Sequence, residues 1–290
     1  MKVSSLLARD RPAISFEFFP PKTPEGEAAL VRTIDALRPL GPAFVSVTRT
    51  GGKPREATIE LVARIQALGI PGAAHVTGIE ATRDDIARVV DVIAARGIEN
   101  MVALRGDVPP DPAFCRPADG FRYAADLVGF VRARAPGLCI AGACHPEGHP
   151  ETRNLDLEID HLRAKVDAGL DVLITNMVYD NAHYFRFVDR VRAAGLRVPV
   201  VPGIMPLTNL PQIARIAQLC GCSIPVTLRR ALEGAGGDEA AATAVGVEWG
   251  TRQCAELIRG GVRGIHFYTL NKSPATRAIF ENLRTERLVD

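Results

Sequence analysis

The chain has 290 residues, of which 47% are hydrophobic and 23% are charged, and its formal net charge is +2. A net charge this close to zero provides no dominant field for nucleic acid or an anionic membrane, so a small molecule is the expected partner. No stretch reaches the roughly 18 unbroken apolar residues of a membrane span, and the first charges come too early for a signal sequence. We therefore expect a cytoplasmic protein with no membrane and no nucleic-acid partner.

Apolar, β-rich runs of about six residues alternate along the chain with longer amphipathic segments, which is typical of parallel strands joined by helical crossovers. One such segment, "TRDDIARVVDVIAARG", is predicted to begin at a capping Thr82 and to stop at Gly97. The expected strands are residues 13–19, 43–48, 72–78, 100–106, 138–145, 171–179, 198–204 and 264–270.

Eight strand-plus-helix units favour one closed (β/α)8 TIM barrel over residues 1–290, because no glycine fingerprint follows the first strand and no linker interrupts the chain. The widest gap between strands, from about 205 to 263, is expected to hold two or three helices rather than one. The six cysteines lack C-x-x-C spacing, which argues against a disulfide framework or zinc knuckle. The closest pair, Cys220 and Cys222, is interpreted as a turn that ends a helix.

Functional side chains of such barrels gather where the strands end, and polar residues occupy those positions here. They are Glu17, Thr48, His75, Thr77, Arg105, Asp107, His145, Asn176, Tyr268, Asn271 and Lys272.

Glu17 lies in "ISFEFFPPKT", between phenylalanines and before two prolines that stiffen the strand exit. Burial among aromatic rings is expected to raise its carboxyl pKa toward the range of a general acid. The alternative is a structural salt bridge to a buried Arg or Lys.

"ALRGDVPPD" places Arg105, Gly106 and Asp107 at the end of the fourth strand. Gly106 permits close approach of a ligand to the backbone, although an ordinary turn has the same composition.

"HPEGHPE" carries His145 and His149 four residues apart, but its prolines and glycine forbid the helix that a two-histidine metal site needs. A loop metal site stays possible, and hydrogen bonds to a ligand are favoured. Lys165 follows in a predicted helix, and a lysine on a helix is by default expected to lie on its solvent-exposed face. Glu158 and His161 could share a stripe with it at the barrel rim.

Eight motifs in one collinear order resemble methylenetetrahydrofolate reductase of the bacterial type. They are "FEFFPPKT", "FVSVT", "AAHVTG", "ALRGD", "HPEGHPE", "KVDAGLD", "VPGIMP" and "HFYTLN". The resemblance implies a barrel that holds FAD at the strand ends, oxidises NADH or NADPH and reduces 5,10-methylenetetrahydrofolate to 5-methyltetrahydrofolate by alternating use of one site. It also implies a homo-oligomer, with a folate as the small-molecule substrate and no metal.

The resemblance further assigns roles to individual residues. Glu17 matches the proton donor that opens the folate ring, Asp107 matches an aspartate beside flavin and pterin, and Arg105 and Lys165 would neutralise the diphosphate. The implied flavin contacts are Thr48, His75, Arg105, Gly106, Asp107, Tyr123, Ala124, His145, His149, Glu158, His161 and Lys165. The implied folate contacts are Asp107, Asn176, Gln212 and Lys272.

The chain departs from the family pattern at several of these positions. Arg49 opens a shorter and more basic loop over residues 49–53, where the family has a tyrosine and a Gly/Ala-rich turn. Asn176 replaces a glutamine, His145 a tyrosine, His161 an asparagine and Lys272 an arginine. Two other readings remain, a non-catalytic flavin- or folate-binding barrel and a pterin-dependent methyltransferase barrel. The pattern does not distinguish NADH from NADPH, since it lacks a glycine fingerprint with an acidic ribose contact.

Overall fold

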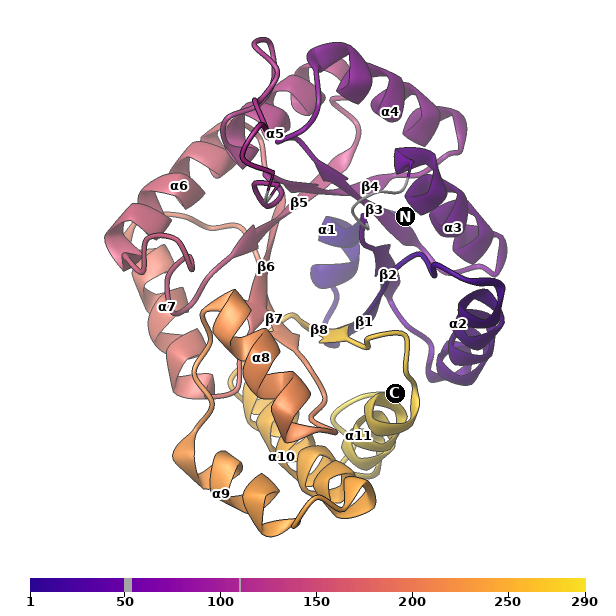
Figure 1. Cartoon of the computed structure of the whole chain (residues 1–290), viewed down its shortest axis with the longest axis vertical. Helices are drawn as coiled ribbons and strands as arrows, with labels where there is room; N and C mark the ends of the chain where they lie inside the picture. Colours follow the sequence, from indigo (N-terminus) through magenta and orange to yellow (C-terminus); the bar gives the residue numbers. More distant parts are fainter. Residues whose placement is uncertain (50–53, 110) are drawn as a thin grey trace.

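Eight parallel strands close into a barrel in chain order, with β1 paired to β8 (Figure 1). The computed structural model describes residues 1–49, 54–109 and 111–290. The strands are β1 (Ala13–Phe18), β2 (Phe44–Val47), β3 (Gly72–Thr77), β4 (Asn100–Leu104), β5 (Cys139–Cys144), β6 (Val172–Met177), β7 (Val200–Ile204) and β8 (Gly264–Tyr268). The predicted (β/α)8 barrel is confirmed.

Helices surround the barrel, except for α1, which lies across one end of it, and all but the first and the last lie between successive strands in the chain (Figure 1). They are α1 (Val3–Leu7), α2 (Pro24–Leu37) with the 3-10 turn η1 (Arg38–Leu40), α3 (Arg55–Ala67), α4 (Arg83–Ala95), α5 (Ala124–Arg134), α6 (Leu155–Asp167), α7 (Asn181–Ala193), α8 (Leu210–Cys220), α9 (Val226–Gly234), α10 (Glu239–Arg259) and α11 (Pro274–Thr285). The stretch between β7 and β8 holds α8, α9 and α10, as the long gap predicted.

The helix boundaries follow local chemistry that is visible in the sequence. The Thr82 side chain accepts a hydrogen bond from the Asp85 backbone at 3.1 Å, and the Asp85 carboxylate accepts one from the Thr82 backbone at 3.0 Å. This capping box begins α4 at the predicted residue. The α8 helix ends at Cys220 because Gly221 adopts φ +72°, so the turn predicted for the cysteine pair is confirmed.

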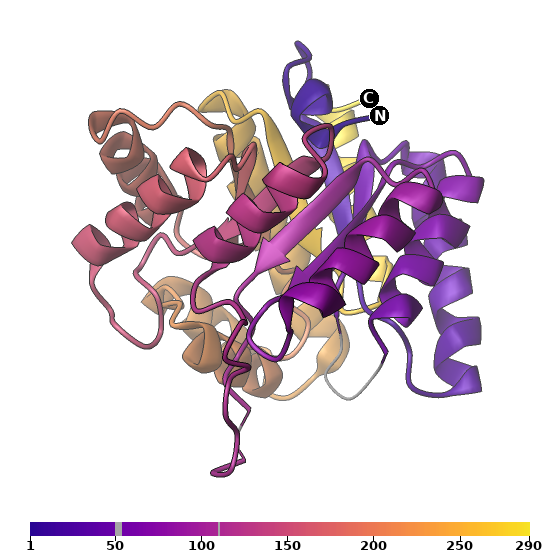
Figure 2. The ribbon, with the colours of Figure 1, turned by 90° about the horizontal axis from the view of Figure 1, so that it is seen from above.

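The amino-terminal end of the barrel is closed by an apolar plug. Val3, Leu6 and Leu7 of α1 are buried against residues near the starts of the strands, among them Phe44 and Val201. Both chain termini lie at this end (Figure 2). The described residues between β4 and α5, on either side of position 110, project from the opposite end (Figure 2). Since α1 plugs the end where the strands begin, a site is expected at the carboxyl ends of the strands.

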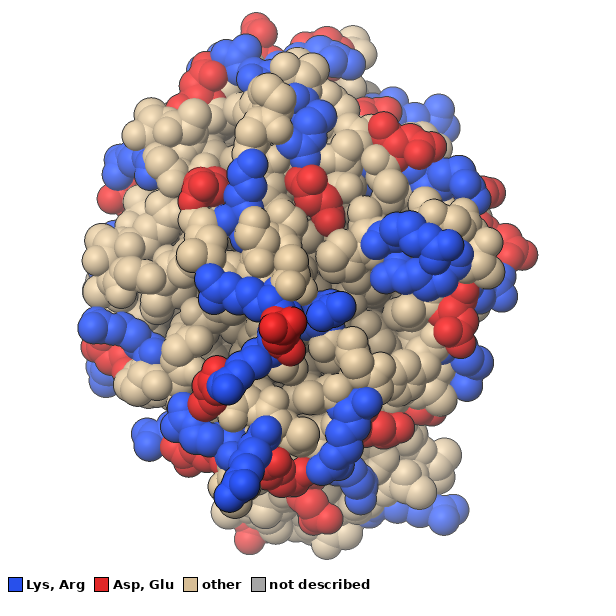
Figure 3. Space-filling model, turned by 180° about the vertical axis from the view of Figure 1, so that it is seen from behind, with Lys and Arg blue, Asp and Glu red and all other residues tan. Residues whose placement is uncertain are grey.

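Charged side chains of both signs are interspersed over the face seen in Figure 3, in keeping with the small net charge. Within the described ranges, no helix has the length and apolar character to cross a membrane.

Candidate active site

Glu17 points into the barrel from near the end of β1, where three other strands supply polar neighbours. Its Oε2 atom lies 3.3 Å from His75 Nε2 of β3 and 3.4 Å from His266 Nε2 of β8. The Ser46 hydroxyl of β2 donates to the same oxygen at 3.3 Å. Among the described residues, no hydrogen bond or ion pair to the second carboxyl oxygen, Oε1, is found.

The prediction that aromatic side chains surround the Glu17 carboxyl group is wrong. Side chains alternate along a strand, so Phe16 and Phe18 point outward and belong to the apolar layer that includes Leu30 and Ile34 of α2. The alternative, a salt bridge to buried Arg or Lys, is also not what the structure has: in the part of the chain it describes, both charge partners of Glu17 are histidines.

The raised pKa predicted for Glu17 is likewise wrong. Burial is the largest influence and raises the pKa of this carboxyl group, but His75, His266 and Ser46 together bring the pKa below its usual range. Burial also lowers the pKa of His75 and so disfavours its charged form. When His75 is charged, it lowers the pKa of Glu17. The groups therefore titrate as a coupled set, in which the location of one proton depends on the others.

The end of β4 carries the predicted Arg105, Gly106 and Asp107. Gly106 has φ +87°, and a Cβ built on it would lie 3.1 Å from the Thr77 side chain, so the position strongly favours glycine. Asp107 is exposed. The Arg105 guanidinium forms a two-pronged ion pair with Glu151, with Nη1 2.8 Å from Oε2, and this pair raises the pKa of Arg105.

A second polar group joins the end of β5 to α6. Glu158 is buried and accepts hydrogen bonds from the His145 backbone at 3.0 Å and from His145 Nδ1 at 3.1 Å. Lys165 is also buried, and its Nζ donates to the Ala143 carbonyl at 2.6 Å. The solvated face considered for Lys165 is therefore wrong. Burial lowers the pKa of Lys165, while the nearby Glu158 opposes that effect.

The "HPEGHPE" stretch is not helical, as its prolines predicted, and the rings of His145 and His149 meet edge to face 4.7 Å apart. Over the described parts of the chain, no three His, Cys, Asp or Glu side chains are grouped so that they could hold a metal ion. At the start of α5, the exposed ring of Tyr123 lies 5.6 Å from that of His161, beside the half-buried Ala124.

The residues assigned to folate lie at the same end of the barrel on separate elements. Asn176 sits at an irregularity in the β6–β7 pairing, and its amide donates to the Cys220 carbonyl at 2.9 Å, holding the end of α8. Gln212 is exposed in the first turn of α8, and Lys272 is exposed after β8. Thr48 is half-buried after β2, where its backbone donates to the Phe18 carbonyl at 2.8 Å.

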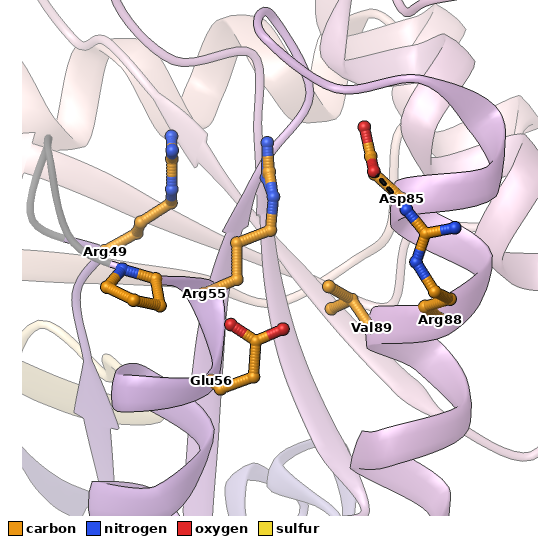
Figure 4. A pocket seen from close by; sticks show the side chains of 7 residues that line it. Arg49, Arg55, Glu56, Asp85, Arg88 and Val89 are labelled. Carbon is orange, nitrogen blue, oxygen red and sulfur yellow. Dashed lines mark hydrogen bonds and ion pairs between the residues drawn. The ribbon is translucent and has the colours of Figure 1, made fainter.

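A cavity of about 280 Å³ lies beside this end of the barrel, between the first turns of α3 and α4 (Figure 4). Arg49 donates to Thr77 Oγ1 at 2.7 Å and to Glu80 Oε2 at 2.8 Å. The cavity is lined by Arg49, Pro54, Arg55, Glu56, Asp85, Arg88 and Val89. Carboxylates accompany the arginines, so its walls are mixed in charge. The altered loop predicted after Arg49 falls on residues 50–53, which lie outside the described residues.

His266 and its neighbours Ser15 and Ser46 were missed by the sequence reasoning. A detectable signal was present, because inward positions alternate with outward ones, and His266 lies between the outward-facing Ile265 and Phe267. A histidine at an inward position of a barrel strand needs a polar partner inside the barrel.

A closed barrel with acid, base and cationic side chains at its strand ends defines an enzyme of the (β/α)8 class. The chain belongs to the methylenetetrahydrofolate reductase family, whose model matches residues 2–284. The family expected from the motifs is thereby confirmed.

Relatives of two kinds match over nearly the whole chain. The chain is 38% identical over 272 residues to the 5,10-methylenetetrahydrofolate reductase of Salmonella typhimurium, covering 93% of this chain and 90% of the relative. It is 34% identical over 297 residues to methylenetetrahydrofolate reductase (NADH) 1 of Arabidopsis thaliana, covering 97% of this chain but only 50% of the relative. The chain thus spans about half the length of the plant relative.

Solved structures share the fold at low sequence identity. An uncharacterized protein from Clostridium thermocellum, described as binding two copies of 5-methyl-5,6,7,8-tetrahydrofolic acid, matches with a TM-score of 0.67 and 17% identity. The match covers 99% of both chains, so the two proteins have the same overall architecture.

Proposed function

We propose that this chain reduces 5,10-methylenetetrahydrofolate to 5-methyltetrahydrofolate, with FAD as its bound cofactor and NADH or NADPH as the electron donor. Family membership supports the reaction, and the observation that carries it is the Glu17 carboxyl group inside the strand ends with two histidines on one of its oxygens. We infer further that residues 1–290 form one catalytic domain, that it works in the cytoplasm and that it assembles as a homo-oligomer.

Several features of the site fit FAD. His75 Nε2 lies 3.3 Å from Glu17 Oε2, but the geometry of that contact is not that of a hydrogen bond. A buried ring nitrogen without a hydrogen bond among the described residues suits a polar ring system above β3. Gly106 presents bare backbone at the end of β4, and Tyr123 and His161 offer neighbouring aromatic faces. When bound, FAD supplies a hydride carrier between nicotinamide and folate.

Arg105 and Lys165 differ in how well they suit the diphosphate. Arg105 is partly exposed and paired with the exposed Glu151, so it can turn from that partner to a phosphate. Lys165 is buried, and its Nζ donates a hydrogen bond to the Ala143 carbonyl, so it could bind a phosphate only after that hydrogen bond is broken. We therefore assign the larger part of this binding to Arg105.

Glu17 would act as the general acid on the folate. Opening the five-membered ring requires a proton on the leaving nitrogen, because the carbon–nitrogen bond then breaks with its electron pair on that nitrogen and an iminium forms at the other. Asp107, exposed beside the site, would accept hydrogen bonds from the pterin and orient it. Asn176, Gln212 and Lys272 would contact the rest of the folate.

The test is direct. The purified protein should show a flavin spectrum that NADH or NADPH bleaches under anaerobic conditions and that 5,10-methylenetetrahydrofolate restores. The donor that bleaches faster would identify the preferred nucleotide. Bound flavin that no donor bleaches would favour a non-catalytic binding barrel, and turnover that needs cobalamin but no flavin would favour a methyltransferase.

A further inference from the structure

His266 lies directly beside Glu17 in the barrel interior, and none of the roles assigned above uses it. The residue is fully buried on β8. Its ring stacks on Phe44 of β2, with centroids 5.7 Å apart and planes at 10°, and meets the edge of Tyr268 at 5.4 Å. These contacts hold the imidazole in one orientation, so that its two nitrogens have distinct and fixed neighbours.

The hydrogen bonds on the Nδ1 side bear on where the ring proton lies. Ser15 Oγ is 2.8 Å from His266 Nδ1 and 3.2 Å from the Ile265 carbonyl oxygen, and its single proton can go to only one of them. When the hydroxyl donates to the carbonyl, Oγ accepts from Nδ1–H. In the neutral imidazole Nε2 then carries no proton and is an acceptor.

The Nε2 side faces Glu17. His266 Nε2 lies 3.4 Å from Glu17 Oε2, and Ser46 Oγ lies 3.3 Å from both atoms. The single hydroxyl proton of Ser46 can serve only one of these two acceptors. An ionised Glu17 would therefore face the lone pair of a neutral His266, whereas a protonated Glu17 can donate to it.

We propose that His266, held as the Nδ1–H tautomer by Ser15, is a positioning residue that keeps the proton on Glu17 until the substrate takes it. This deepens the proposed function and rests on it. In the transfer, the Glu17 O–H bond breaks, an N–H bond forms on the leaving nitrogen of the folate, and that nitrogen keeps the electron pair of its broken carbon bond. Glu17 is left as a carboxylate and His266 stays neutral.

This arrangement explains how a carboxyl group without an aromatic shell can act as an acid near neutral pH. The charges of His75 and His266 and the hydrogen bonds from His266 and Ser46 lower the pKa of the Glu17 carboxyl group. A neutral His266 that presents a lone pair would remove its own two contributions to this lowering. The titratable groups that face this pair are His75 from β3 and Tyr268 from β8. Tyr268 carries no positive charge in either protonation state, and His75 carries one only when it is protonated.

The first test reads the tautomer and needs no activity. In the ligand-free protein labelled with 15N-histidine, the imidazole of His266 should show a protonated Nδ1 and an unprotonated Nε2 at neutral pH. His266→Gln identifies that signal by removing it. An Nε2–H tautomer, or an imidazolium that persists through neutral pH, would overturn the proposal whether or not the protein is a reductase.

The second test uses Ser15→Ala, which keeps His266 but removes the acceptor for Nδ1–H. The ring can then adopt the other tautomer and donate to the Glu17 carboxylate. The high-pH limb of the folate half-reaction should move to lower pH, with a loss of about 10-fold at neutral pH, below the range for complete loss of a general acid. Reduction of the flavin by NAD(P)H should keep its rate.

Two results would contradict this role for His266. One is an unchanged pH profile of the folate half-reaction in both Ser15→Ala and His266→Gln. The other is equal loss in both half-reactions with a lowered melting temperature, which would make His266 a structural residue. If the wild-type protein reduces no methylenetetrahydrofolate, the proposed function fails, and the 15N spectrum still decides the tautomer.

Discussion

Two glutamates, the half-buried Glu17 and the buried Glu158, each have a histidine neighbour, but the rest of their surroundings differs. Glu158 is 3% exposed and accepts two hydrogen bonds from His145, one of them from the backbone, with the Lys165 cation close by. The side chain of Glu17 is 17% exposed, and the ion-pair and side-chain hydrogen-bond partners of its carboxyl group among the described residues are two imidazoles and the Ser46 hydroxyl. A carboxylate that accepts a backbone hydrogen bond keeps that donor at every pH, whereas a carboxylate whose neighbours are imidazoles can exchange a proton with them.

This contrast teaches that burial alone does not identify a general acid. Burial raises the pKa of both carboxyl groups, and the neighbours lower both. What separates them is whether those neighbours can change their own charge near neutral pH. The predictions below test that separation, beginning with the largest expected effect.

Glu158→Gln should lower the free energy of unfolding by about 3 kcal/mol, because it removes the buried anion that accepts two hydrogen bonds from His145 and lies near Lys165, and each hydrogen bond to a charged group contributes about 1.5 to 3 kcal/mol. Urea denaturation followed by far-UV circular dichroism measures this loss. Glu17→Gln is the matched control and should remain much closer to wild type. Equal losses in the two variants would remove the distinction between a structural and a catalytic glutamate.

Glu17→Gln should slow methylenetetrahydrofolate reduction at least ~100-fold, since the amide keeps the shape of the side chain but cannot donate the proton. Flavin reduction by NAD(P)H should survive, because that step needs no acid at the folate nitrogen. Stopped-flow traces of the two half-reactions, timed separately, give the answer. If both half-reactions fall together, Glu17 has no specific role in ring opening.

Arg105→Ala should weaken FAD binding by about 1.5 to 3 kcal/mol, the range for a lost charge-assisted hydrogen bond. Arg134→Ala is a suitable control, since Arg134 also pairs with a carboxylate, Asp91, but lies on the outer surface of α5. Flavin release during dilution, followed by fluorescence, compares them. Equal retention in both variants would assign the diphosphate to other groups.

Glu158 should also contribute to the acid sensitivity of the fold. Its pKa in the folded state is lowered from 4.5, so its stabilising effect is complete above that pH and is lost as the pH falls through the lower folded value. Between about pH 5 and 3, wild type should therefore lose more stability than Glu158→Gln, by about 1.4 kcal/mol per unit of pKa shift. Parallel losses in urea titrations across this range would contradict the assignment.

Much of the fold was determined by local patterns in the sequence. Strands and helices have different hydrophobic periods, so eight alternations of the two patterns predicted the barrel. Thr82 and Gly221 marked helix ends, because capping depends on neighbours within a few residues. The strand-end rule also placed Glu17, His75 and Arg105 at the correct end. The roles of these residues in flavin and folate binding remain predictions.

The partners of the site residues were decided only by the tertiary structure. Closing the barrel brings Glu17 within 3.4 Å of His266, although 249 positions separate them in the chain. The same closure turns Phe16 away from the carboxyl group, and packing of α6 on β5 buries Lys165. A pKa depends on charges and hydrogen bonds within a few ångströms, and local sequence patterns do not specify which distant residues come that close.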